Sequence, residues 1–161
     1  LEKSIDNYQS AFDLLFKCAV KTSLLALSSM KDKKWGRIIN VASISVKEPL
    51  NYLVLSNSLR SALVTWSKTL SVDIAKFNIT INNVLTGYFN TERLKQLNSK
   101  KAEKLGMKIS KIEDTIKETI PMKRFGKPEE YANLVCFLAS NKSDYITGTN
   151  IPIDGGYMKS L

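Results

Sequence analysis

The sequence predicts an α/β protein with a parallel sheet covered by helices on both faces. Two long segments with helical spacing of apolar residues, Ser4 to Met30 and about Tyr52 to Lys76, alternate with the β-branched runs "RIINVAS" and "FNITINNVLTG". This alternation is typical of parallel sheets, whose strands are buried on both sides. Only three strands can be found, and a small parallel sheet with a bare edge is not expected to be stable alone. The chain is therefore predicted to be the back part of a larger fold.

The first half of the chain supplies two helices and one strand. Apolar residues recur at steps of three and four from Ser4 to Met30, until "KDKKWG" breaks the pattern. "RIINVAS" reads as a buried strand, and "SISVKEPLN" reads as a polar loop that ends after Pro49. The second helix carries an apolar stripe made of Leu55, Leu59, Ala62 or Leu63, Trp66, Leu70 and Ile74.

The second half begins with the strand "FNITINNVLTG", after which Gly87 turns the chain. Thr91, followed by Glu92, is a helix N-cap signal, and a lysine-rich helical segment continues to Ile120. "KPEEYANLVCFLAS" has a proline and two glutamates in its first turn, as helix starts prefer. "TGTNIPIDGG" reads as a turn, a short strand and another turn.

Length and composition indicate one ordinary globular domain. The chain has 161 residues, of which 43% are hydrophobic and 24% charged. No apolar run reaches the roughly 18 residues of a membrane span. The mixed start "LEKSIDNYQSAF" does not resemble a secretory signal. A cytoplasmic protein without a membrane partner is expected.

Cysteine and histidine content argues against a metal site. Cys18 and Cys136 lie in apolar helical patterns, which predicts buried reduced thiols. The chain has no histidine, so histidine triads and imidazole acid/base catalysis are excluded. No metal is expected.

The net charge of +9 raises the question of nucleic acid. No recognition motif accompanies it, and the densest group of lysines, between residues 95 and 111, lies on a segment that also carries Glu92, Glu103, Glu113 and Glu118. A solvated helix face is the favoured interpretation, and a surface that attracts an anionic cofactor or substrate is compatible with it. No nucleic-acid partner is predicted.

Four segments together resemble a known family. "WGRIINVASIS", "LSNSLRSALVTWSKTLSVDIAKFNITINNVLTGYFNTERL", "PMKRFGKPEEYANLVCFLAS" and "YITGTNIPIDGG" are similar to the C-terminal part of short-chain dehydrogenases/reductases, and especially to 3-oxoacyl-acyl-carrier-protein reductases. The resemblance implies a Rossmann-type doubly wound parallel sheet of which only the C-terminal part is present. The glycine-rich nucleotide-binding half is absent, so these 161 residues alone are expected to show no turnover. Truncation, disorder and supply by another chain all remain open as explanations.

The family's chemistry is hydride transfer between a nicotinamide cofactor, NAD or NADP, and a small carbonyl or alcohol substrate. Ser43 matches the family's serine, which orients the substrate oxygen, and Ser45 is a weaker substitute. Leu53 and Asn57 fall on the positions of the family's catalytic tyrosine and lysine, and Leu15 falls on its asparagine position. The pattern "LxLSNxxR" resembles a divergent subgroup of the family. An oxidoreductase is therefore expected, with a catalytically impaired dinucleotide-binding or assembly subunit as the alternative.

Three residues are candidates to replace the missing groups. Tyr52 adjoins Leu53, although one residue rotates its side chain by about 100° around the helix. Arg60 lies one turn beyond Asn57 and could supply a fixed positive charge, or form an ion pair at the surface or a subunit interface. Tyr88 follows Gly87 and is a second phenol near the cofactor end.

The expected cofactor site is better preserved than the catalytic positions. "TGYFNT" resembles the family's loop beneath the nicotinamide, in which Thr86 replaces a proline and Gly87 permits close approach. The Phe89 backbone and the Thr91 hydroxyl would meet the carboxamide or a phosphate, and Asn57 could hydrogen-bond the ribose. A plain strand-to-helix turn with an N-cap threonine is the structural alternative.

The resemblance also implies a substrate lid and an oligomer. The segment from Thr91 to about Met122 corresponds to the family's lid, within a single domain that spans residues 1–161. The two long helices resemble those that pack between subunits, and "NIPIDGGYMKSL" resembles another contact region. A homodimer or homotetramer is expected for the intact protein.

Overall fold

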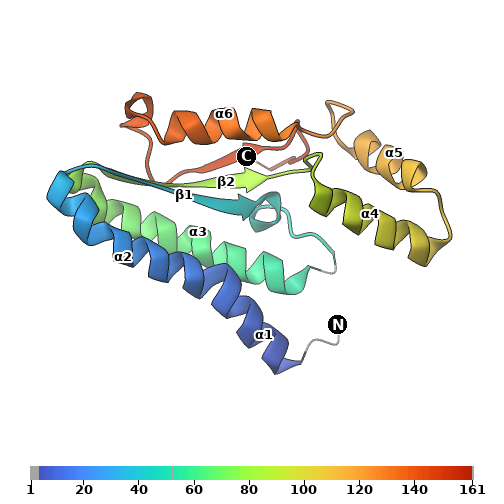
Figure 1. The fold of residues 1–161 in the computed structure, drawn as a ribbon, viewed down its shortest axis with the longest axis horizontal. Coiled ribbons are helices and arrows are strands. Elements are labelled where there is room, and N and C mark those ends of the chain that lie inside the picture. The colour runs from blue at the N-terminus through green and yellow to red at the C-terminus, as the bar shows by residue number, and fades with distance from the viewer. Residues whose placement is uncertain (1–3, 52, 161) are drawn as a thin grey trace.

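A computed structural model describes residues 4–51 and 53–160. Three parallel strands form the sheet: β1 (Gly36–Ser43), β2 (Ile79–Thr86) and β3 (Asn150–Ile153), in the order β1-β2-β3. Helices α2 (Cys18–Lys33) and α3 (Val54–Ile74) lie along one face of the sheet, and α6 (Pro128–Leu138) lies along the other (Figure 1). The predicted α/β architecture is therefore confirmed for the part of the chain that is described.

The first predicted helix is longer than expected and contains an irregularity. It consists of α1 (Ile5–Phe12), the π-helical segment η1 (Asp13–Lys17) and α2 (Cys18–Lys33). The Ser4 side chain accepts a hydrogen bond from the Asn7 amide and so caps the N-terminus. Within η1 the Cys18 amide donates to the Asp13 carbonyl, five residues back, as in a π-bulge.

The second long helix, α3 (Val54–Ile74), ends in the 3₁₀ turn η3 (Ala75–Phe77). Its buried face is set by Leu63, Val64, Ser67, Ser71 and Ile74. The predicted stripe is therefore displaced, because Trp66 and Leu70 pack from the flank against the core instead of occupying its centre. Ser67 can lie in the buried face because its hydroxyl donates to the Leu63 carbonyl and accepts from Asn40 Nδ2.

The apolar core lies between the sheet and the pair α2 and α3. One cluster joins Leu27, Ile38, Ile74, Ile79 and Ile81. A second cluster, nearer the C-terminal ends of the strands, joins Ala42, Ile44, Val64 and Leu85, with Tyr157 and Met158 packed on it. The chain after β3 thus returns across the end of the sheet where β1 and β2 finish.

A row of asparagines crosses this sheet from the buried Asn40 and Asn83 to the exposed Asn150. Asn40 on β1 donates to Asn83 on β2 over 3.0 Å, and Asn83 donates to Asn150 on β3 over 2.9 Å. Each amide thus has a partner, as burial requires. This polar ladder ties the three strands together at a fixed register.

The remaining elements form the opposite layer and one end of the molecule. The 3₁₀ turn η2 (Ile44–Val46) follows β1, and η4 (Asn141–Ser143) follows α6 (Pro128–Leu138). Helices α4 (Glu92–Leu105) and α5 (Ile109–Thr119) lie beyond the C-terminal end of β2 (Figure 1). Together they make up the segment predicted as a lid.

The predicted burial of the cysteines is wrong, because Cys18 and Cys136 are both free and exposed. Helical phase explains the error. Cys136 lies two residues, or about 200°, from the buried Leu138, and Cys18 is similarly out of phase with Ser23 and Leu27.

None of the helices in the described ranges is both long and apolar enough to cross a membrane. Over the same ranges, no group of three or more acidic or cysteine side chains is arranged to hold a metal ion.

Candidate functional site

The candidate site is built where β1 and β2 end side by side. Ser43 and Thr86 are the last register partners of the β1–β2 ladder, and Gly87 follows directly. Adjacent strands are about 4.8 Å apart, so Ser43 lies one strand away from the Gly87 turn. The family resemblance implied that Ser43 and the Gly87 turn belong to one site. The strand register brings these two segments next to each other.

Both side chains belong to the face of the sheet that α6 covers. Asn40 and Ala42 contact Ser67 and Val64 of α3, so Ser43 lies on the other face because strand side chains alternate. Thr86 reaches Tyr131 of α6. The Ser43 hydroxyl accepts a hydrogen bond from the Ser45 amide and so caps η2. The Ser45 hydroxyl is itself buried without a hydrogen-bond partner.

Gly87 is required by packing against β3. Its amide donates to the Ile153 carbonyl over 3.1 Å. A Cβ at this position would lie 2.7 Å from both Cα and Cβ of Asp154, which is too close for a real contact. The turn therefore depends on glycine whether or not a ligand approaches it.

Replacing Gly87 with alanine is expected to lower the free energy of unfolding by about 1–3 kcal/mol, the usual cost of forcing a methyl group into a packed site. Urea unfolding of the full-length protein measures this change. Gly106→Ala is the control: an added Cβ there meets nothing within 4 Å, and only its positive φ of 61° is strained. Equal stability of Gly87→Ala and the parent protein would show that β3 can move aside.

In the loop after Gly87, the backbone N–H and C=O of Phe89 point away from Gly126, with which Phe89 forms an isolated parallel bridge. The Asn90 amide donates to the Gly126 carbonyl, and the Gly126 amide donates to the Tyr88 carbonyl, each over 2.9 Å. In such a parallel bridge the N–H and C=O of the central residue, Phe89, point the opposite way. The Phe89 ring is buried and meets the Tyr131 ring edge-on, with 5.3 Å between centroids.

A cavity of about 240 Å³ adjoins this loop. It is lined by Thr86, Phe89, Thr91, Pro128 and Tyr131. Three of the five predicted cofactor residues thus share one cavity. The Thr91 hydroxyl also accepts a hydrogen bond from the Leu94 amide, so its predicted role as the N-cap of α4 is confirmed.

Tyr131 is the residue that reasoning from the sequence missed. Its phenol oxygen accepts a hydrogen bond from the Thr86 hydroxyl over 3.2 Å. Burial raises the pKa of Tyr131, while the Thr86 hydrogen bond and the positive charge of Arg60 lower it. Only one sequence signal bears on it: Tyr131 is a tyrosine in the first turns of a helix that follows "GKPEE".

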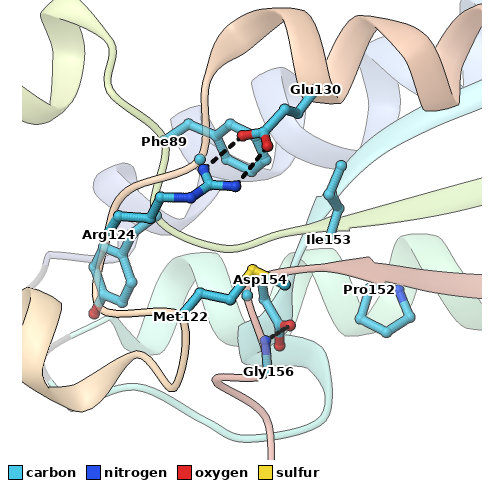
Figure 2. Close-up of a pocket in the computed structure, with 11 residues that line it drawn as sticks. Phe89, Met122, Arg124, Glu130, Pro152, Ile153, Asp154 and Gly156 are labelled. Atoms are coloured by element: carbon cyan, nitrogen blue, oxygen red, sulfur yellow. Dashed lines mark hydrogen bonds and ion pairs between the residues drawn. The ribbon is translucent and has the colours of Figure 1, made fainter.

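A second cavity, of about 360 Å³, lies on the other side of Phe89 and reaches the end of β3. Figure 2 shows the Arg124 guanidinium facing the Glu130 carboxylate beside Phe89, with Asp154 and Gly156 at the opposite wall. Arg124 donates two hydrogen bonds to Glu130, over 2.8 and 2.6 Å. Glu130 also accepts from the Lys127 amide over 2.7 Å, which gives a partner to a backbone donor at the start of α6.

The Glu130 contacts predict a pH-dependent stability. Its side-chain hydrogen bond with Arg124, followed by the Lys127 amide, lowers the pKa of Glu130 from 4.5 to about 2. Because the folded-state value is the lower one, the stabilisation is complete above pH 4.5 and is lost as the pH falls toward 2. Glu130→Gln is therefore expected to have a lower Tm than the parent protein at pH 7, with the two converging in acid.

Melting curves of the full-length protein at a series of pH values test this expectation. Glu129→Gln is the matched control, since it removes the same charge from the same helical turn. A constant difference in Tm between parent and Glu130→Gln from pH 7 to pH 3 would contradict the assigned interaction.

The positions of the missing tyrosine and lysine lie at the start of α3. Leu53 is the N-cap residue of α3 and is 46% exposed. Asn57 turns its amide toward the preceding loop, where Nδ2 donates to the Leu50 carbonyl over 2.9 Å. Its Oδ1 atom is buried without a hydrogen-bond partner.

Asn57 lines a third cavity, of about 490 Å³, with Pro49, Leu50, Asn51, Val54, Ser58 and Ser61. None of the predicted loop residues from Thr86 to Thr91 lines it. Asn57 is thus placed beside a different hollow from the other predicted cofactor residues. Leu15 lies half-buried within the π-helical segment η1.

The three candidate replacements fare differently. Arg60 donates to the Val41 carbonyl over 2.6 Å and to the Ser56 hydroxyl over 3.3 Å, and burial lowers the pKa of its guanidinium. Burial, together with the neighbouring Tyr157, raises the pKa of Tyr88 to about 12. Tyr52 lies outside the described residues.

These observations fit a nicotinamide at the ends of β1 and β2. The Phe89 backbone groups are aimed away from their bridge partner, and the Thr86–Tyr131 pair lies beside the loop. Asn57 does not join this group, because its unpartnered Oδ1 is buried and its side chain lines a different cavity. No residue in the chain offers the glycine-rich turn that would hold the dinucleotide phosphates.

Comparisons with known proteins identify the family. A family model described as enoyl-(acyl carrier protein) reductase matches residues 1–158. The NADPH-dependent reductase BacG of Bacillus subtilis (strain 168) is 40% identical over 136 residues, which are 84% of this chain and 52% of that protein. A 3-oxoacyl-[acyl-carrier-protein] reductase FabG of Aquifex aeolicus (strain VF5) is 33% identical over 131 residues, or 81% of this chain and 48% of that protein.

Solved structures show the same fold. The crystal structure of YwfH, an NADPH-dependent reductase involved in bacilysin biosynthesis, matches with a TM-score of 0.94 and 36% identity over 99% of this chain and 61% of that one. L-sorbose reductase from Gluconobacter frateurii, complexed with NADPH and L-sorbose, matches with a TM-score of 0.92 and 30% identity over the same shares. The chain spans about half the length of the curated relatives. It belongs to the short-chain dehydrogenase/reductase family, of which it represents the C-terminal region.

Proposed function

We propose that this chain is the C-terminal part of an NAD(P)H-dependent oxidoreductase that interconverts a small carbonyl compound and its alcohol. The observation that carries the proposal is the register of β1 and β2, which places Ser43 beside Thr86 and Gly87. The carboxyl ends of parallel strands are where α/β proteins bind ligands. BacG and FabG, the two relatives described above, are reductases, and BacG is NADPH-dependent.

In this proposal each site residue has a defined task. The bound nicotinamide supplies the hydride that adds to the carbonyl carbon. The Ser43 hydroxyl donates a hydrogen bond to the substrate oxygen and fixes its position. The Phe89 backbone and the Thr91 hydroxyl hold the carboxamide, Gly87 keeps the turn flat against β3, and Asn57 accepts a hydrogen bond from the ribose.

The segment from Thr91 to about Met122 is proposed as the substrate lid. Its two helices, α4 and α5, lie beyond the C-terminal end of β2 and so adjoin the site (Figure 1). Asn98 and Ala102 are buried in α4, and Ile112 is buried in α5, so both helices are anchored to the rest of the chain. Lids of this kind exclude water during the reaction.

The proposal is tested by oxidation of NADPH and NADH, followed at 340 nm with the full-length protein. The substrates should include ketose sugars, 3-oxoacyl thioesters and simple aldehydes. The first two kinds are chosen because one relative is an L-sorbose reductase and another is a 3-oxoacyl-[acyl-carrier-protein] reductase. Saturable turnover of one class with one nucleotide supports the proposal. Its absence for every pair, with a folded protein, counts against it.

A second function is favoured by the start of α3. Leu53 has no proton to donate, and Asn57 carries no charge that would acidify a phenol. A dinucleotide-binding or assembly subunit without turnover would have the same loop at residues 86–91. Calorimetric binding of NADPH without any turnover would identify this function.

We also infer that the intact protein is a homodimer or homotetramer. Large apolar side chains are exposed along the first helical segment: Ile5, Tyr8, Phe12, Leu14, Leu24 and Leu25. Exposed apolar patches of this kind mark contacts with other chains. Light scattering coupled to size-exclusion chromatography should give two or four times the mass of the full-length chain.

A further inference from the structure

One departure from the family pattern contacts a tyrosine of α6. Thr86 stands where the resemblance implies proline, which has no hydroxyl to donate. Its hydroxyl donates to the phenol oxygen of Tyr131, 45 residues further along the chain, over 3.2 Å. Because the phenol accepts from Thr86, its own O–H remains available to another acceptor.

Ser43 lies one strand away from the Thr86–Tyr131 pair. Ser43 and Thr86 are register partners, so the two strands are about 4.8 Å apart at this point. Both side chains lie on the face of the sheet that α6 covers, where Tyr131 joins Thr86. An oxygen atom held by Ser43 at the end of β1 would therefore lie within reach of the Tyr131 hydroxyl.

We propose that Tyr131 donates the proton to the substrate oxygen, in place of the phenol that Leu53 cannot supply. The proposal rests on the function proposed above and extends it to a residue in α6. Thr86 is then a positioning residue, since it holds the phenol oxygen without touching the substrate.

The proposed step balances as follows. As the hydride adds to the carbonyl carbon, the C=O double bond becomes a single bond and its oxygen gains negative charge. The O–H bond of Tyr131 breaks, and a new O–H bond forms on the product alcohol. The phenolate left on Tyr131 accepts a hydrogen bond from Thr86 and later takes a proton from water.

Charges around the two phenols distinguish Tyr131 from Tyr88. Arg60, reaching from α3 to the Val41 carbonyl at the end of β1, interacts electrostatically with Tyr131. Burial raises the pKa of Tyr131, and the positive charge of Arg60 offsets part of this rise because it favours the phenolate. Tyr88 instead packs on the Tyr157 ring, 5.4 Å between centroids, and that second phenol disfavours its phenolate.

The neighbouring carboxylate does not interfere with this arrangement. Glu130 precedes Tyr131 on α6, but its two oxygens are engaged by Arg124 and by the Lys127 amide. The groups that bear on the Tyr131 phenol are thus Thr86 from β2 and Arg60 from α3.

Tyr131→Phe in the full-length protein is the test. Loss of a positioned proton donor is expected to lower kcat roughly 100- to 10,000-fold, with the Kd for NADPH unchanged. Tyr145→Phe is the matched control, because Tyr145 is fully exposed, and it should keep the parent kcat. Thr86→Val should lower kcat less than Tyr131→Phe does.

A spectroscopic titration supplies a readout that does not depend on turnover. The difference in phenolate absorbance at 295 nm between the parent protein and Tyr131→Phe reports the ionisation of Tyr131. Arg60→Met should move this ionisation to higher pH, whereas Tyr145→Phe should leave it in place. If Tyr131 had only a structural role, Tyr131→Phe would change Tm, but Arg60→Met would not shift the ionisation of Tyr131.

The outcomes separate the two proposals. If the parent protein turns over and Tyr131→Phe retains kcat within a factor of three, the assignment of Tyr131 is overturned and the proposed function stands. If Arg60→Met leaves the ionisation of Tyr131 unmoved, the assigned electrostatic partner is overturned. If the parent protein itself shows no turnover, both proposals fail together.

Discussion

Ser43→Ala is expected to lower kcat of the full-length protein on the order of 100- to 1,000-fold, because it removes one preorganised hydrogen-bond donor to a developing oxyanion. The hydroxyl lies at the C-terminal end of β1, where backbone pairing with β2 fixes its position. The KM for the nucleotide should change little, since the proposed cofactor contacts come from the loop after β2. A loss confined to kcat assigns Ser43 to the transition state.

Two controls keep this result interpretable. Ser43 also caps η2 by accepting from the Ser45 amide over 3.1 Å, so alanine removes a structural contact as well. A melting curve must therefore show that Ser43→Ala remains folded. Ser58 is an exposed residue of α3 whose hydroxyl donates to the Val54 carbonyl. The variant Ser58→Ala removes this hydroxyl and should keep the parent kcat. Near-normal kcat for a folded Ser43→Ala would refute the proposed role.

The order of helices and strands was predictable because it depends on local pattern. "RIINVAS" lies within β1, which extends from Gly36 to Ser43, and "FNITINNVLTG" contains β2. Amphipathic spacing found both long helices to within a few residues. The family resemblance, read from motifs distributed over the whole chain, is confirmed by the match to residues 1–158.

Features that depend on packing were not predictable in this way. The π-helical turn from Asp13 to Lys17 packs against α3, and nothing in its side chains distinguishes it from an α-helical turn. The stripe on α3 was displaced toward Ser67 and Ser71, whose hydroxyls bond to carbonyls of their own helix. A hydroxyl that finds such a partner can be buried, which a hydropathy pattern does not reveal.

The candidate site was predictable only in part for the same reason. Ser43, Thr86 and Gly87 follow from strand ends, which a sequence pattern locates well. Tyr131 was missed because its partner, Thr86, is distant in sequence. Asn57 remains a proposed ribose contact, although its amide turns toward Leu50 and so towards a cavity that residues 86–91 do not line.

Asn82→Ala is expected to lower the free energy of unfolding by about 3 kcal/mol, because it leaves three part-buried polar groups without this partner and removes a buried side chain. Asn82 is fully buried on β2. Its Nδ2 donates to the Ile146 carbonyl over 2.8 Å, and its Oδ1 accepts from the Thr149 amide over 3.3 Å and the Thr149 hydroxyl over 3.0 Å. One side chain thus holds the turn that leads into β3.

Thr149→Val separates these contributions, since it removes only the hydroxyl contact and preserves the shape of the side chain. It should cost about 1 kcal/mol, the usual net worth of one hydrogen bond. Urea unfolding of the full-length protein measures both variants, and an unchanged m-value would show that the compared states are the same. Equal losses for the two variants would mean that the Ile146 contact contributes nothing. Because β3 holds the Gly87 amide through Ile153, Asn82→Ala should also raise the KM for the nucleotide, which links the stability of this turn to the proposed site.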